Sequence, residues 1–162
     1  MQALKFRNEY KHIINKNHAA ALKSRLKTLL KTDPFAGENG EYFIRSLYFD
    51  TYEDKSLFEK IDGVPLRHKY RIRFYNHDHS VIKLENKLKK FNSVCKIIAN
   101  ITKVEVEKIL NREYNFLKES GDPVKIAFYQ ELISGYVPKT IVDYTRAPFI
   151  YPHGNVRITI AQ

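Results

Sequence analysis

Basic side chains recur at every second position in several stretches of this chain that have the composition of β-strands. Side chains two positions apart on a strand point to the same face of a sheet, so each stretch places its charges on one side and its apolar residues on the other. A sheet built from these strands is predicted to have one cationic face, and clustered like charges repel unless an anion neutralises them. The alternation therefore favours a polyanionic ligand. The stretches contain Lys5, Arg7, Glu9 and Lys11; Arg71 and Arg73; Lys83, Glu85 and Lys87; and Arg157.

Length and composition fit a single domain over residues 1–162. With 43% hydrophobic and 28% charged residues, the chain can bury a core and is not expected to be disordered. Its formal net charge of +10 favours an anionic partner such as nucleic acid, anionic lipid or a phosphate-rich small molecule. Cys95 is the single cysteine, so no intrachain disulfide partner exists. We expect a cytoplasmic domain with no transmembrane segment in this chain, since no sufficiently long apolar run is present.

Strand and helix patterns alternate along the chain. Short turns join the strands of 66–91 and of 139–160, which favours antiparallel pairing and an α+β domain with an antiparallel sheet or barrel. A capping box, Thr102-x-x-Glu105, opens one of the helices. Strands are predicted over 5–14, 42–49, 66–75, 81–91, 94–101, 139–145 and 155–160, and helices over 16–30, from 50 or 51 to 61, and in pieces between 102 and 133.

A simpler interpretation competes with a binding face, because the exposed side of any two-faced sheet alternates polar and apolar residues. For one strand alone, such as the one carrying Arg71 and Arg73, the simpler interpretation is the stronger. Several strands that share the same basic bias favour a ligand. Arginine offers a planar fork and lysine a mobile point charge, a mixture that suits a chain of phosphoryl groups.

Six motifs in fixed order resemble those of VTC-type polyphosphate polymerase domains, which belong to the CYTH-like triphosphate tunnel metalloenzymes. This resemblance spans nearly the whole chain and implies an antiparallel β-barrel, the triphosphate tunnel fold, with flanking helices. The motifs are Arg7-Asn8-Glu9-Tyr10-Lys11, Arg45-Ser46-Leu47-Tyr48-Phe49-Asp50, Tyr70-Arg71-Ile72-Arg73-Phe74-Tyr75, Leu84-Glu85-Asn86-Lys87, Asp143-Tyr144-Thr145-Arg146-Ala147-Pro148-Phe149 and Val156-Arg157-Ile158-Thr159-Ile160.

What the resemblance implies is a phosphotransferase that moves the terminal phosphoryl group of a nucleoside triphosphate such as ATP onto polyphosphate. A divalent metal, Mn or Mg, would accompany the nucleotide. Arg45 and Tyr144 would support the site. Glu9 and Glu85 are candidate metal ligands by the same comparison, although ion pairs with Lys11 or Lys87 are an equal alternative. The phosphate-binding residues carried over are Lys11, Arg71, Arg73, Lys87, Lys96, Arg146 and Arg157, of which Arg71, Arg73, Lys87, Arg146 and Arg157 would act in catalysis.

Domains of this type continue beyond the Val156–Ile160 motif to strands that bring a metal-binding glutamate. Because this sequence stops at Gln162, we expect a barrel that is incomplete at its C-terminus and an impaired activity, unless a second chain or a downstream segment completes it. The alternative is a non-catalytic module that binds polyphosphate, triphosphate or nucleic acid, of which nucleic acid is the less favoured because no RNA-binding motif is present. The sequence His77-Asp78-His79 is interpreted as a solvated turn rather than a metal site.

Overall fold

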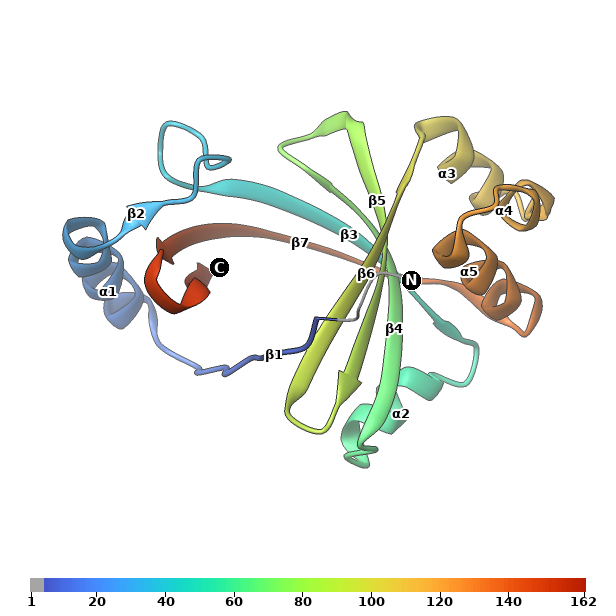
Figure 1. Ribbon diagram of the computed structural model, residues 1–162, viewed down its shortest axis with the longest axis horizontal. Helices are drawn as coiled ribbons and strands as arrows, with labels where there is room; N and C mark the ends of the chain where they lie inside the picture. Colours follow the sequence, from blue (N-terminus) through green and yellow to red (C-terminus); the bar gives the residue numbers. More distant parts are fainter. Residues whose placement is uncertain (1–4) are drawn as a thin grey trace.

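Eight strands form one curled antiparallel sheet in the computed structural model, which describes residues 5–162 (Figure 1). Their order across the sheet is β1-β6-β5-β4-β3-β7-β2, and β8 also pairs with β7. Every recorded pairing is antiparallel, which confirms the predicted α+β class. Within residues 5–162 the sheet curls without closing into a barrel. The strands are β1 Arg7–Asn8, β2 Lys31–Thr32, β3 Tyr42–Thr51, β4 Leu66–Tyr75, β5 Asp78–Lys90, β6 Ser93–Ile101, β7 Tyr136–Tyr151 and β8 Val156–Ala161.

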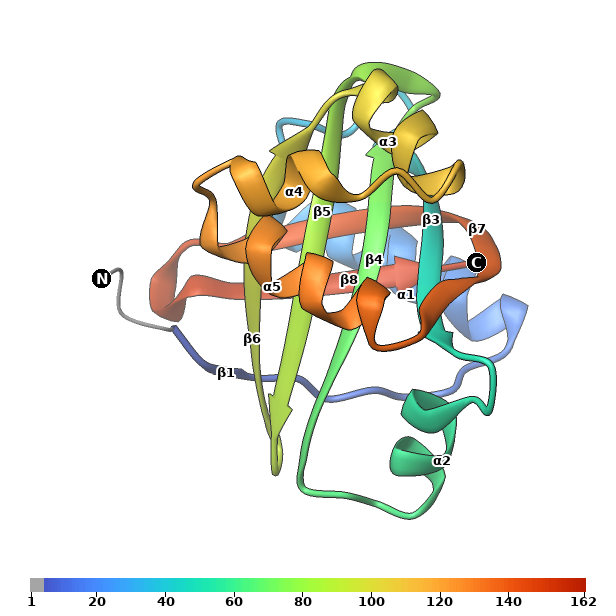
Figure 2. The ribbon, with the colours of Figure 1, turned by 90° about the vertical axis from the view of Figure 1, so that its right-hand side faces the viewer.

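Three helices cover one face of the sheet, over β4, β5 and β6 (Figure 2). They are α3 (Lys103–Leu110), α4 (Asn115–Glu119) and α5 (Pro123–Ile133). Thr102 and Glu105 form the predicted capping box at the start of α3. The main core lies beneath these helices, where the Phe128 ring packs edge to face on Phe49 at 4.9 Å. This arrangement leaves the opposite face of the sheet free of α3–α5.

Helix α1 (Lys16–Leu29) lies at the other end of the molecule and packs against β7 and β8. Ala19 of α1 contributes to a smaller buried cluster with Ala147, Phe149 and Ile160. Two short helices complete the fold, α2 (Lys55–Ile61) and the 3-10 turn η1 (His153–Asn155). None of the helices from residue 5 onward is long and apolar enough to cross a membrane.

The strand predicted over 5–14 is much shorter in the structure, and Lys5 is its first described residue. Only Arg7 and Asn8 pair, with Val94 and Ser93 at one end of β6. Residues 9–15 then leave the sheet and run to α1, whose first turn is capped by the side chain of Asn15. The period-two pattern was a weak guide here because the chain must cross to another part of the fold, where no neighbouring strand accompanies it.

Candidate functional site

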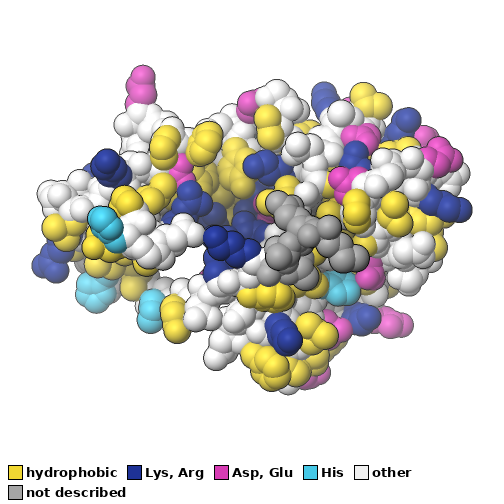
Figure 3. Space-filling model, in the orientation of Figure 1, with side chains coloured by type: hydrophobic (Ala, Val, Ile, Leu, Met, Phe, Trp, Pro, Cys, Tyr) yellow, Lys and Arg dark blue, Asp and Glu magenta, His cyan; other side chains and the backbone are white. Residues whose placement is uncertain are grey.

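The register of β3, β4, β5 and β6 gathers the cationic residues on the sheet face opposite α3–α5. Arg71 pairs with Glu85 across β4 and β5, and Arg73 pairs with Lys83. Lys87 of β5 lies opposite Lys96 of β6. Figure 3 shows Lys and Arg side chains in the hollow between the two ends of the molecule. The predicted cationic face is therefore present, and we call the side chains of Arg71, Arg73, Lys87, Lys96 and Arg146, together with Glu85, the cationic cluster.

Arg71 and Glu85 form a buried ion pair at the centre of this cluster. The Arg71 side chain donates from Nε to Glu85 Oε2 at 2.7 Å and from Nη1 to Tyr48 Oη at 2.9 Å, and Nη2 also donates to Glu85. Glu85 is 1% exposed. Burial opposes ionisation of Glu85, but the charges of Arg71, Lys96 and Arg73 outweigh it and lower the pKa of the carboxyl group. All three guanidinium nitrogens of Arg71 are thus engaged.

Arg73 is fully buried at 0% exposure, yet it is not fully hydrogen-bonded. Its Nε donates to Ser46 Oγ at 2.8 Å and its Nη2 to Tyr144 Oη at 3.0 Å. Arg146 Nη2 donates to the same Tyr144 oxygen, also at 3.0 Å. Among residues 5–162, Arg73 Nη1 and Arg146 Nε are buried without any hydrogen-bond partner. Since an unsatisfied buried donor costs about 1–3 kcal/mol, both nitrogens would gain from an anion that enters the hollow.

Lys96 and Lys87 extend the cluster along β6 and β5. Burial lowers the pKa of Lys96 to about 8, although the Glu85 carboxylate opposes this shift. Lys87 Nζ donates to Glu9 Oε2 at 2.9 Å, and Lys11 Nζ lies 3.7 Å from the other oxygen of Glu9. The Lys96 amine therefore changes its charge around pH 8, whereas Lys87 is held beside an acid.

Three residues expected at the site lie elsewhere or are already paired. Arg45 is on the other face of β3, where its Nε donates to Asp143 Oδ1 at 2.9 Å. Arg157 of β8 forms an ion pair with Asp33. Lys11 lies in the extended segment after β1, and its side chain is largely exposed. The register thus gathers Arg71, Arg73, Lys87, Lys96, Arg146 and Tyr144, and it separates Arg45 from them.

Ser46 and Tyr48 are site residues that the sequence did not single out. Ser46 accepts from Arg73, and Tyr48 accepts from Arg71. Ser46 and Tyr48 are two positions apart in β3, so they share one face of the strand, and Arg45 lies on the other. This shared face was the signal in the sequence. The sequence does not show which face that is, because this depends on the register in which Ser46 pairs with Arg73 and Tyr48 with Arg71.

The acidic residues near the cluster, which are candidate metal ligands, are engaged in ion pairs. Glu85 is paired with Arg71, and Glu9 is paired with Lys87. In the part of the chain that the structure describes, no three His, Cys, Asp or Glu side chains are grouped so that they could hold a metal ion. The His77 ring instead stacks on Phe43, with 4.2 Å between ring centroids. The described donor set therefore does not fit a metal held by protein ligands alone.

Comparisons with known proteins agree with this geometry. The sequence model of the VTC domain matches residues 6–162. Among solved structures, the chain is similar to a Bacillus halodurans protein assigned as an adenylate cyclase, with a TM-score of 0.60 and 16% identity over 98% of this chain and 73% of that one. At this identity the likeness concerns the fold alone. No curated protein matches the chain.

Proposed function

Because the chain belongs to the VTC domain family and has a curled sheet of the triphosphate tunnel type, we propose that it binds the triphosphate of a nucleoside triphosphate on its cationic cluster. The proposed reaction transfers the terminal phosphoryl group to polyphosphate. Cytoplasmic residence belongs to the same proposal, since Cys95 is buried and unpaired. The reaction class is inferred from the family, and the chemistry of the cluster has to accommodate it.

The observation that carries the proposal is the pair of unsatisfied buried donors. Among the described residues, Arg73 Nη1 and Arg146 Nε lack partners although both side chains are held in place by Tyr144. Phosphate oxygens are strong acceptors, and hydrogen bonds between guanidinium and phosphate are short and charge-assisted. A triphosphate would therefore satisfy donors that the folded chain leaves open.

Phosphoryl transfer asks the protein mainly to align the attacking and leaving oxygens and to stabilise the negative charge spread over the transferred group. Arg73 and Arg146 would hold the reacting phosphates, because their guanidinium groups are already oriented. Lys96 and Lys87 would add mobile charge along the chain of phosphates. Arg157 and Lys11 would contribute only after they exchange Asp33 and Glu9 for phosphate oxygens.

A divalent ion, Mn or Mg, enters this proposal as part of a metal–nucleotide substrate. Mg often binds mainly through substrate phosphates and water, with few protein carboxylates. The ion pairs of Glu85 and Glu9 described above make that the form consistent with this chain. No step of the reaction is assigned to a protein-held metal.

The ion pairs of Glu85 and Glu9 also favour a second candidate, a module that binds triphosphate or polyphosphate without catalysing a reaction. Both Glu85 and Glu9 neutralise cations, so neither is released for metal binding unless its partner moves. Nucleic acid is a less favoured ligand of this module. Release of ADP from ATP with growth of polyphosphate, in the presence of Mg or Mn, would support transfer; salt-dependent binding without ADP release would support the module.

The test of the shared first step is calorimetric titration with inorganic tripolyphosphate. Replacement of Arg73 by Ala removes the unsatisfied donor and should weaken binding by about 1.5–3 kcal/mol, or roughly tenfold to a hundredfold. Arg25→Ala is the matched control, because Arg25 is exposed on α1 and carries the same charge. Equal affinities of Arg73→Ala and Arg25→Ala would exclude the cluster as the binding site.

A further inference from the structure

A segment without regular secondary structure, residues 9–15, connects β1 to α1 and passes the face of the sheet that carries the cationic cluster. Figure 2 shows it running behind β5 and β4, on the side of the sheet away from α3–α5. We call residues 9–15 the crossing segment. It is anchored at both ends, by the pairing of Asn8 with Ser93 and by the side chain of Asn15, which caps α1.

The crossing segment is held loosely between these two anchors. Within the described part of the chain, no backbone–backbone hydrogen bond involves residues 9–14. Tyr10 is 82% exposed, so its ring contributes little packing. Among residues 5–162, the one hydrogen bond between the segment and the sheet joins Glu9 to Lys87, at 2.9 Å. Few contacts therefore oppose a movement of Glu9 away from the sheet.

The Glu9 carboxylate occupies a position that an anionic ligand would use, because its partner Lys87 belongs to the cationic cluster. Partial burial raises the pKa of Glu9, but the hydrogen bond from Lys87 and the charges of Lys87, Lys11 and Arg7 outweigh it and lower this pKa. The side chain is thus a carboxylate at neutral pH, and Lys87 gives it the charge-assisted bond that a phosphate oxygen would accept. A phosphate beside Lys87 would be repelled by Glu9 as long as the carboxylate stays there.

We propose that Glu9 is an autoinhibitory group, which covers Lys87 in the free protein and has to leave before a triphosphate or polyphosphate chain binds there. This inference rests on the proposed function. The apparent affinity of the ligand is reduced by the fraction of molecules in which Glu9 holds Lys87. The anchors of the crossing segment allow the movement, because neither the pairing of β1 nor the cap of α1 involves Glu9.

Glu9→Gln tests the inference in calorimetric titrations of the full chain with inorganic tripolyphosphate at fixed ionic strength. Glutamine keeps the size of the side chain and removes its charge, so it neither repels a phosphate nor holds Lys87 as a carboxylate does. The variant should bind tripolyphosphate about fivefold more tightly than the wild-type chain, which is the effect expected of one partly exposed ion pair.

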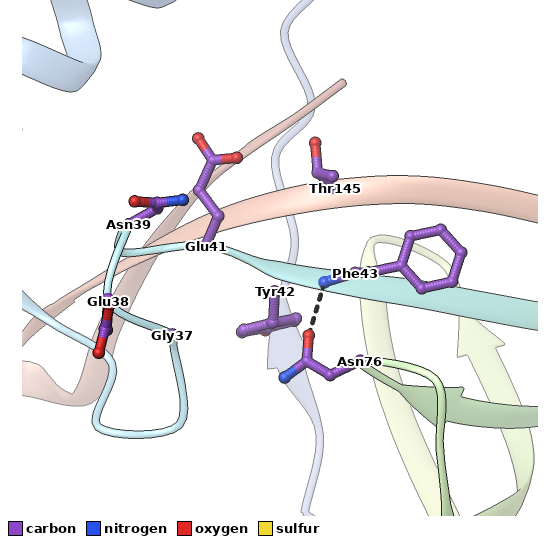
Figure 4. Close-up of a pocket in the computed structure, with 8 residues that line it drawn as sticks. All are labelled: Gly37, Glu38, Asn39, Glu41, Tyr42, Phe43, Asn76 and Thr145. Atoms are coloured by element: carbon purple, nitrogen blue, oxygen red, sulfur yellow. Dashed lines mark hydrogen bonds between the residues drawn. The ribbon is translucent and has the colours of Figure 1, made fainter.

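Glu41→Gln is the matched control. Glu41 pairs with Lys23 of α1, and this pair is partly exposed like that of Glu9 and Lys87, so both variants lose one negative charge from a similar pair. Glu41 lines a cavity with Phe43 (Figure 4), and Phe43 shares the face of β3 that lies opposite the cationic cluster. The affinity of Glu41→Gln should stay within about twofold of the wild-type value.

A second background separates a local effect from a general change of charge. In Lys87→Met the partner of Glu9 is absent, so the further change Glu9→Gln should improve the affinity by less than about twofold. Equal affinities of Glu9→Gln and Glu41→Gln, or a fivefold gain that persists in the Lys87→Met background, would overturn the inference and leave the proposed function standing. Failure of the wild-type chain to bind tripolyphosphate at all would overturn both.

Discussion

Replacement of Glu85 by Gln should destabilise the fold strongly and strengthen anion binding at the same time. The Glu85 carboxylate is buried and accepts a hydrogen bond from Arg71 at 2.7 Å. Burial alone would raise its pKa, but the charges of Arg71, Lys96 and Arg73 lower it. Glutamine keeps the size of the side chain and removes the charge. The guanidinium of Arg71 would then be buried without a counter-charge, beside two further cations.

Breaking a buried ion pair by removing one partner costs about 3–5 kcal/mol. Because a domain is typically stable by about 5–15 kcal/mol, this loss is large enough to shift a urea unfolding curve clearly. Glu9→Gln is the matched control: its carboxylate pairs with Lys87 but is substantially exposed, so the loss should stay below about 1 kcal/mol. Tripolyphosphate should stabilise Glu85→Gln more than the wild-type chain, since it supplies the missing negative charge.

The contribution of Glu85 to the free energy of unfolding should decrease at acidic pH. Folding lowers the pKa of Glu85, so its stabilising contribution is present above the unfolded pKa of about 4.3 and disappears as the pH falls through the lower folded value. The difference in unfolding free energy between the wild-type chain and Glu85→Gln should therefore be constant from about pH 5 to 7 and shrink below about pH 4. The reasoning would be refuted if Glu85→Gln were as stable as Glu9→Gln. It would also be refuted if tripolyphosphate stabilised Glu85→Gln no more than it stabilises the wild-type chain.

Two further perturbations separate binding from stability. Because Lys96 has a pKa of about 8, its charge is lost as the pH rises, so the affinity advantage of the wild-type chain over Lys96→Met for tripolyphosphate should be roughly tenfold at pH 7 and shrink by pH 9 in calorimetric titrations. The Thr102 hydroxyl caps α3 by accepting from the Glu105 backbone N–H at 3.2 Å, and Thr102→Ala removes this bond. The variant should lose about 1 kcal/mol of unfolding free energy, measured in urea, and keep the wild-type affinity for tripolyphosphate.

The parts of the fold that were predictable from the sequence are those that local patterns specify. The capping box at Thr102 opens α3 as expected, and the turn-flanked stretches of 66–75 and 81–91 form the hairpin of β4 and β5. The strand predicted over 5–14 was wrong beyond Asn8, because a strand also needs a neighbour and β6 offers one only at Ser93 and Val94. The alternation of polar and apolar residues indicates which side chains of a segment would share a face. Whether the segment forms a strand depends on a neighbouring strand elsewhere in the chain.

The candidate site follows the same division. Alternation correctly placed Arg71, Arg73 and Lys87 on one face, because the parity within a strand is a local property. Parity could not relate β3 to β4, since a shift of one residue in register exchanges the two faces of a strand. Arg45 was grouped with the site through the motif in which it lies. Ser46 and Tyr48 of the same motif were overlooked, although these two contact the arginines.

The two arginines of the Arg71-x-Arg73 pattern are equivalent in the sequence and different in the structure. Arg71 has every guanidinium nitrogen bonded, two of them to Glu85, so its charge is balanced within the fold. Arg73 is bonded only to neutral hydroxyl groups, and its Nη1 is open within the described residues. A phosphate would need the side chains that cover Arg73 to move but would break none of its hydrogen bonds, whereas at Arg71 it must displace a carboxylate. The anion should therefore bind first at Arg73 and Arg146, while Arg71 stays bonded to Glu85 and donates to the hydroxyl of Tyr48, and the strongest loss of affinity is expected at Arg73.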